Sequence, residues 1–110
     1  MATDKTGAPT TVTQESDRFS IEVDAKKAGF TEYADRDGRR IFPHTEVSDE
    51  FGGRGLATIL VNHALQETRD AGLRIVAVCP MVVGFLRKHP EFDDDVDPVD
   101  ADVKRWLANS

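Results

Sequence analysis

Disulfide bonds, membrane spans and a positive charge excess are all missing from this sequence. Its single cysteine, Cys79, cannot form an internal disulfide. Its longest apolar run, residues 75–79, is far shorter than the roughly 20 residues that span a bilayer. The chain has 14 Lys and Arg against 20 Asp and Glu and no basic stripe, which excludes nucleic acids and anionic membranes as partners. The N-terminus lacks the apolar segment of a secretory signal, so we expect a cytoplasmic protein.

Metal ligands are few and scattered. Cys79 and the three histidines, His44, His63 and His89, show no spacing typical of a zinc site. The acidic residues 93–97 lack the glycine and the terminal glutamate of a calcium loop, which indicates a solvated turn. We therefore predict that the protein has no metal site.

The remaining sequence is patterned like one small domain. Residues 1–17 are rich in Thr, Ser, Pro and Gly and poor in large apolar side chains, so we predict a flexible tail. Residues 18–110 are expected to form a single folded domain. It begins with three strands, over residues 18–23, 28–34 and 39–47, because polar and apolar side chains alternate and residues 35–38 supply a turn. These strands are expected to form an antiparallel meander.

Helical spacing predicts the second half of the domain. Apolar residues recur every three or four positions over 54–71, and Gly72 follows as a helix cap. Residues 73–79 are continuously apolar and are expected to form the central strand of the sheet. A second helix over 81–89 is stopped by Pro90. A last amphipathic piece carries Val99, Val103, Trp106 and Leu107. We predict an α/β (α+β) fold with a mixed, mostly antiparallel sheet flanked by two main helices.

A glycine-rich segment, Gly52-Gly53-Arg54-Gly55-Leu56-Ala57, lies between the third strand and the first helix. Glycines let backbone N–H groups approach a phosphate, and the helix N-terminus adds a partial positive charge. The pattern lacks the third glycine of a dinucleotide fingerprint and the Gly-Lys-Ser/Thr of a nucleotide loop. By itself it is equally well explained as a flexible turn that leads into a helix.

Cys79, His44 and Glu46 are the candidates for catalysis. Cys79 ends the apolar strand, and ligands of open α/β sheets gather at such strand ends, with His44 as the candidate base. The residues alone favour the alternative of a buried, structural thiol. His44, Glu46 and Ser48 alternate along one strand and are expected to share a face. That face is either a proton-transfer site or simply solvated.

Several short motifs together resemble a known family. They are His44-Thr45-Glu46-Val47, the glycine loop with its helix, Val78-Cys79-Pro80 and Arg87-Lys88-His89-Pro90. Their order and spacing over residues 18–92 resemble the small stand-alone acetyltransferase-like domains of the YjdJ type, a minimal branch of the GNAT superfamily. The superfamily signature is Gln or Arg, two residues, Gly, one residue, then Gly or Ala. The chain departs from it at the first position, where it has Gly52.

The resemblance implies acetyl-CoA as the cosubstrate. The loop residues Gly52, Gly53, Arg54, Gly55, Leu56 and Ala57 would bind the pyrophosphate, and the backbone at Val47 would pair with the pantetheine arm. Cys79 and Pro80 would lie near the acetyl thioester, which favours a role for Cys79. Phe85 falls in the cofactor region where many members carry a Tyr that protonates the leaving thiolate, so the general acid is unassigned.

Two mechanisms follow from the resemblance. Glu46 or His44 would deprotonate a primary amine for direct attack on the thioester, or Cys79 would be acetylated first with His44 as its base. The acceptor would be a small amine or a lysine side chain, and the protein a monomer or a weak homodimer. The alternatives are a CoA-binding or protein-interaction module with little turnover, and a redox sensor built on Cys79.

Overall fold

The computed structural model describes residues 2–3, 9–48 and 55–109 of the chain. The elements in chain order are β1 (Ala2–Thr3), β2 (Pro9–Gln14), β3 (Arg18–Val23), β4 (Lys26–Glu32), β5 (Ala34–Arg36), β6 (Arg39–Phe42), β7 (Thr45–Val47), α1 (Leu56–Asp70), β8 (Arg74–Ala77), α2 (Pro80–Lys88), the 3-10 helix η2 (Pro90–Asp95) and α3 (Ala101–Ala108). The strands form two sheets. One is antiparallel with the order β1-β2-β3-β4-β7, and the other has the order β5-β6-β8 with β6 and β8 parallel. The predicted fold class is confirmed.

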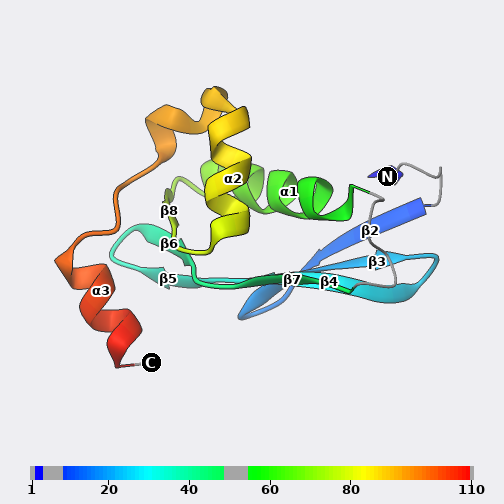
Figure 1. Ribbon diagram of the computed structural model, residues 1–110, viewed down its shortest axis with the longest axis horizontal. Helices are drawn as coiled ribbons and strands as arrows, with labels where there is room; N and C mark the ends of the chain where they lie inside the picture. Colours follow the sequence, from blue (N-terminus) through cyan, green and yellow to red (C-terminus); the bar gives the residue numbers. More distant parts are fainter. Residues whose placement is uncertain (1, 4–8, 49–54, 110) are drawn as a thin grey trace.

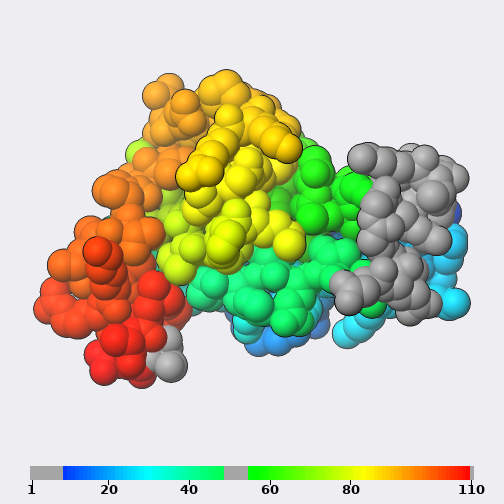
Figure 2. Space-filling view, viewed as in Figure 1, coloured from blue at the N-terminus to red at the C-terminus, as the bar shows by residue number. Residues whose placement is uncertain are grey.

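The helices lie on both faces of the sheets (Figure 1). Helices α1 and α2 cover one face and enclose the main core, which includes Phe19, Leu60 and Ile75. Helix α3 packs on the opposite face of β6 and β8 through a second cluster of Ile41, Val76 and Val103. Figure 2 shows α2 on the molecular surface beside the segment that contains β6 and β7. Of the helices described, none has the length and apolarity that a membrane crossing would need.

Several sequence predictions are confirmed. Strand β3 has the predicted bounds, and α1 and α2 lie within about two residues of theirs. Gly72 follows the end of α1 with a φ of 76°, a left-handed conformation that glycine adopts without a steric penalty. Its N–H donates to Arg69, and the next N–H, of Leu73, donates to Thr68. These bonds satisfy carbonyl groups that the helix end leaves without partners.

Part of the segment predicted to be a flexible tail belongs to the sheet. Strand β2 pairs with β3 over residues 10–14, Thr10 is buried, and Val12 packs against the main core. The prediction relied on the lack of large apolar side chains. A strand is also held by its backbone ladder, and threonine fits a pleated sheet well. Residues 9–14 therefore extend the domain toward the N-terminus.

The segment 39–47, expected to be one strand, forms two. Strand β6 pairs with β5 and β8, whereas β7 pairs with β4. Pro43 lies between them and has no N–H to donate to a sheet ladder. The chain therefore changes sheets at Pro43.

Strand β8 is at a sheet edge rather than in the centre. Among the described residues its neighbours are β6 on one side and an isolated bridge from Ile75 to Val96 on the other. Its continuous hydrophobicity has a different cause. Ile75 faces the main core and Val76 faces the second cluster beneath α3. Burial of both faces by helices gives the same sequence pattern as a central position.

Candidate functional site

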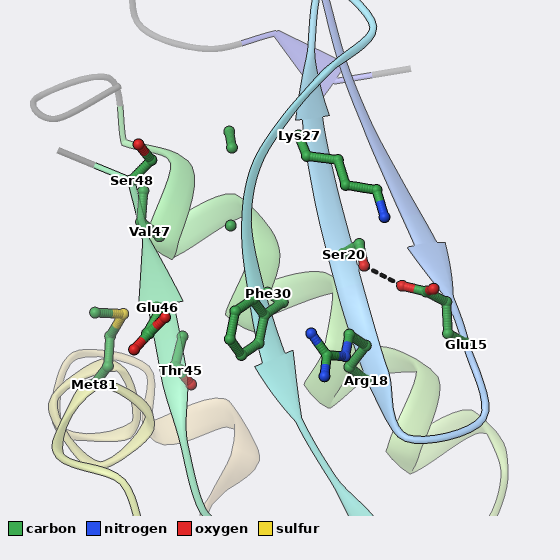
Figure 3. A pocket seen from close by; sticks show the side chains of 12 residues that line it. Glu15, Arg18, Ser20, Lys27, Phe30, Thr45, Glu46, Val47, Ser48 and Met81 are labelled. Atoms are coloured by element: carbon green, nitrogen blue, oxygen red, sulfur yellow. Dashed lines mark hydrogen bonds between the residues drawn. The ribbon is translucent and has the colours of Figure 1, made fainter. Parts of the chain in front are cut away.

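The two sheets diverge where β6 ends and β7 begins. The carbonyl oxygen of Phe42 accepts hydrogen bonds from the N–H groups of Val78 and Cys79 at 3.2 and 3.1 Å. Beyond this point the chain leaves β8 and pairs with β4 from Thr45 to Val47. One side of β7 is thus paired with β4, and the other faces the start of α2, where Met81 lies (Figure 3).

The edge of β7 that faces α2 presents backbone polar groups. Ser48 N–H donates to the Ala28 carbonyl at 2.7 Å, and Glu32 N–H donates to the His44 carbonyl at 2.8 Å. Backbone groups of alternate residues point to opposite sides of an antiparallel strand. The groups of Thr45 and Val47 therefore point away from β4. They can pair with an extended ligand as a further strand would.

The position of β7 depends on a close approach to Gly29 of β4. A Cβ atom at Gly29 would lie 2.5 Å from the carbonyl oxygen of Glu46 and 3.0 Å from Cα of Val47. Both neighbours are backbone atoms that cannot move without moving the strand. Glycine at this position therefore lets β7 lie close against β4.

Helix α1 begins next to the same edge and is suited to an anion. Its N-cap, Gly55, has a left-handed conformation with a φ of 75°. Within the described residues, no side chain caps the first N–H groups, and the first turn has no acidic residue. Such N–H groups and the helix dipole favour a phosphate. Gly52, Gly53 and Arg54 lie outside the described residues, so their part in a phosphate site stays a prediction.

A hollow of about 230 Å³, here called the cofactor-side hollow, lies between α1 and α2. It is lined by Ala57, Thr58, Val61, Met81, Gly84, Phe85, Lys88 and His89. Ala57 and Phe85 are among the residues that the sequence assigned to the cofactor. The lining combines apolar surface with the positive charge of Lys88. Pro80 is the first residue of α2, where its missing N–H has no cost.

A larger groove of about 730 Å³, here called the outer groove, crosses β3, β4 and β7 on the sheet face opposite to α1 and α2 (Figure 3). It is lined by Glu15, Arg18, Ser20, Lys27, Ala28, Gly29, Phe30, Thr45, Glu46, Val47, Ser48 and Met81. Met81 lines both the groove and the cofactor-side hollow. The two depressions therefore share Met81, which lies beside β7.

His44 and Glu46 form a pair on the face of the outer groove. His44 Nε2 lies 2.9 Å from Glu46 Oε1, and the two side chains are 49% and 62% exposed. The Phe30 ring lies beside His44 with centroids 6.1 Å apart. The predicted alternation is confirmed, since His44, Glu46 and Ser48 are exposed and Thr45 is buried. A solvent-accessible His and carboxylate in contact can accept and pass on a proton.

Cys79 lies in a different environment. Its residue is 4% exposed, and its sulfur lies 3.2 Å from Thr45 Oγ1. Thr45 in turn shares a hydrogen bond of 2.7 Å with the Thr31 hydroxyl. Neighbouring residues of a strand point to opposite faces, so His44 points away from the side on which Thr45 meets Cys79. The structure does not bring Cys79 and His44 together as the sequence proposed.

The other two histidines lie elsewhere. His63, on α1, is 3.9 Å from Glu67, and the ring of His89 stacks on Phe85 with centroids 3.8 Å apart. In the described part of the chain, no group of three or more His, Cys, Asp or Glu side chains is placed to hold a metal ion.

Sequence reasoning missed Arg18, Phe30, Thr45 and Met81 as site residues. Alternation along β3 does place Arg18 and Ser20 on one face, but the pairing of β3 with β4 and of β4 with β7 decides what lies beside them. Met81 follows Cys79-Pro80 directly, and that proximity was the available signal. Its role at both depressions depends on how α2 packs.

The comparisons with known proteins agree with this geometry. Residues 18–96 match the family model of GCN5-related N-acetyltransferases. A solved structure with a similar fold is the NMR solution structure of a GCN5-like protein from Staphylococcus aureus, with a TM-score of 0.64 and 25% sequence identity over 83% of this chain and 91% of that one. Among curated proteins, none matches the chain in sequence. Neither match addresses the YjdJ-type branch. The family model covers most of the described domain, and the chain belongs to the GCN5-related N-acetyltransferase family.

Proposed function

We propose that this protein transfers the acetyl group of acetyl-CoA to a primary amine that binds in the outer groove. The observation that carries the proposal is that Met81, beside the β7 edge, lines both the outer groove and the cofactor-side hollow. Bound CoA on the helix side and an amine on the other side would place the thioester and the amine at this edge. Holding both reactants in contact is itself a large part of catalysis.

The cofactor would lie along the helix side. Its pyrophosphate would meet the N-terminus of α1, where Gly55, Leu56 and Ala57 begin the helix. Its pantetheine arm would pair with the backbone of Thr45 and Val47. The cofactor-side hollow, with Phe85 and Lys88, would receive a further part of the molecule. The acetyl thioester would then lie near Cys79 and Pro80, at the start of α2.

Transfer by direct attack uses the pair of His44 and Glu46. Glu46, directly or through a water molecule, accepts a proton from the ammonium form of the acceptor, and His44 can pass it to solvent. The amine nitrogen then attacks the thioester carbonyl carbon. The carbon–sulfur bond breaks, the nitrogen gives its second proton to a water molecule, and CoA leaves as a thiolate that takes a proton from solvent. A backbone N–H of Thr45 or Val47 would stabilise the oxyanion.

Direct transfer agrees with the contacts of Cys79 better than the covalent route. A covalent mechanism needs a base that removes the thiol proton. The partner of the Cys79 sulfur is the hydroxyl of Thr45, and a hydroxyl is a poor base. The covalent route stays a second mechanism, and the variants in the Discussion separate the two.

The proposal is tested by calorimetric titration with acetyl-CoA, followed by turnover with a panel of primary amines. We expect saturable binding and turnover. In Glu46→Gln we expect kcat/KM to fall by about 100-fold or more, with acetyl-CoA affinity unchanged. Glu91→Gln, an exposed change on η2, is the matched control and should have no effect.

Three results decide between the functions. Turnover that depends on Glu46 supports the proposal. Binding of acetyl-CoA without turnover of any amine would favour the alternative of a CoA-binding or protein-interaction module. Absence of acetyl-CoA binding would rule out both.

A further inference from the structure

The floor of the outer groove is built from three side chains in register. Ser20 of β3 pairs with Phe30 of β4, and Phe30 pairs with Glu46 of β7. Paired residues project to the same face, and adjacent strands are about 4.8 Å apart, so Ser20 and Glu46 are separated by roughly 10 Å. Phe30 therefore forms an apolar floor between two polar ends.

The two ends of the groove carry opposite charges. Glu46 lies beside Met81 at the β7 end, where the reaction is proposed to occur (Figure 3). Arg18 and Lys27 lie on the other side of Phe30 (Figure 3). The carboxylate of Glu15 at that end accepts a hydrogen bond from the Ser20 hydroxyl, which satisfies part of its bonding capacity. Two cations thus face the groove at the end far from Glu46.

Arg18 is held in a position that suits a carboxylate. Its guanidinium carbon lies 4.5 Å from the centroid of the Phe30 ring, and the side chain is 34% exposed. Among the described residues, the carboxylate closest to it is that of Asp17, which lies 3.5 Å from Nε and is 67% exposed. Stacking on a ring fixes the plane of the guanidinium, and its terminal nitrogens can bind both oxygens of a carboxylate.

We propose that the acceptor is an aminocarboxylate, a primary amine joined to a carboxylate by a short methylene chain. Its ammonium group would lie at Glu46, its methylenes on Phe30 and its carboxylate at Arg18, with Lys27 adding a second positive charge. This inference rests on the proposed function and specifies its substrate. The same chemistry occurs in a free ω-amino acid such as aminocaproate and in a peptide that ends in lysine, where the side-chain amine and the terminal carboxylate are similarly spaced.

The test compares acceptors that differ at one end. Turnover is measured with aminocaproate, with hexylamine, which lacks the carboxylate, and with a peptide that ends in lysine as a free acid or as an amide. We expect aminocaproate or the free-acid peptide to have a KM lower than its uncharged counterpart by roughly tenfold. Preference for the free molecule or for the peptide identifies the source, and either one supports the proposal.

Arg18→Met tests the recognising residue. Methionine keeps an apolar side chain over Phe30 and removes the charge, so we expect the KM of aminocaproate to rise to that of hexylamine while the KM of hexylamine stays unchanged. Arg18→Lys should restore part of the difference. Arg36→Met, an exposed change on β5, is the matched control. Binding of aminocaproate to the CoA complex, followed by NMR, shows whether the variant is folded and measures affinity without turnover.

The inference and the proposed function fail in different ways. Equal use of hexylamine and aminocaproate, with no effect of Arg18→Met, would overturn the aminocarboxylate inference and leave the acetyltransferase function intact. Aminocaproate that binds through Arg18 without ever being acetylated would overturn the proposed transfer and leave the binding site. No binding and no turnover of any carboxylate-bearing amine would also overturn the inference.

Discussion

The Thr45 hydroxyl lies 3.2 Å from the Cys79 sulfur and joins the start of β7 to the start of α2. Thr45 also bonds Thr31 at 2.7 Å, so the thiol ends a buried chain of two hydroxyl groups. Thr45 lines the outer groove as well. This contact gives the thiol a threonine partner instead of His44.

Cys79→Ala is expected to keep most of the activity, because direct transfer needs no enzyme nucleophile. We expect kcat to stay within about tenfold of the unmodified protein, since the thiol's contribution is packing. Mass spectrometry of protein quenched during turnover provides the second measurement. Detection of acetylated Cys79 together with loss of activity in Cys79→Ala would establish the covalent mechanism.

Thr45→Val, which removes the hydroxyl at nearly constant volume, should destabilise the fold by about 1–2 kcal/mol because the Thr31 hydroxyl loses a buried partner.

Gly29→Ala is expected to push β7 away from β4. The new Cβ would lie 2.5 Å from the Glu46 carbonyl oxygen, so we expect a loss of about 1–3 kcal/mol in the free energy of unfolding and weaker binding of acetyl-CoA. Urea unfolding and calorimetry measure the two effects. Gly84→Ala is the control for stability, because a Cβ there meets nothing within 4 Å and alanine favours a helix. Unchanged stability in Gly29→Ala would contradict the close approach of the strands.

Arg40→Met tests a buried ion pair that connects β5 and β6. Arg40 bonds both carboxylate oxygens of Asp35 at 2.6 and 2.9 Å, its guanidinium lies over the Tyr33 ring, and its side chain is 6% exposed. The hydrogen bond to Asp35 raises the pKa of Arg40, so it stays charged. Loss of the pair should lower the free energy of unfolding by about 1–3 kcal/mol. The loss is limited because Asp35 is 45% exposed and water can solvate its carboxylate. Thermal unfolding measures the change, and Arg36→Met on the same hairpin should be nearly neutral.

Low pH should weaken the attachment of α3, because it protonates the carboxylate of Asp100. The Val103 N–H and the Arg39 guanidinium donate to its carboxylate at 2.9 and 2.7 Å, and these bonds lower the pKa of Asp100. A lowered folded-state pKa contributes stability above the unfolded value of about 3.9, and this contribution is lost as pH falls through the folded pKa. The fluorescence of Trp106, the single tryptophan, should report the change below about pH 4. In Asp100→Asn the amide oxygen still caps α3, so the transition should be less dependent on pH. An identical acid profile in both proteins would show that other carboxylates control it.

Local patterns in the sequence were sufficient for the elements whose causes are local. The bounds of β3 follow from the alternation of polar and apolar side chains, and α1 follows from the helical spacing of its apolar residues. The end of α1 follows from the left-handed conformation of Gly72. All three signals lie within a few neighbouring residues. The shared face of His44 and Glu46 followed from the same alternation. The motifs between residues 44 and 90 indicated the family, which the match over residues 18–96 confirms.

Tertiary structure decided what local patterns could not contain. The chain changes sheets at Pro43, β8 lies at an edge with its outer face covered by α3, and β2 joins the sheet through its backbone. Cross-strand register places Phe30 beside Glu46, the Arg18 guanidinium lies over the Phe30 ring, and the packing of α2 gives Cys79 a threonine partner. Each of these contacts joins residues distant in sequence, and the free energy that selects them comes from burial and pairing of whole elements. The sequence by itself therefore determined the elements and the family, while the partners within the site were decided by the fold.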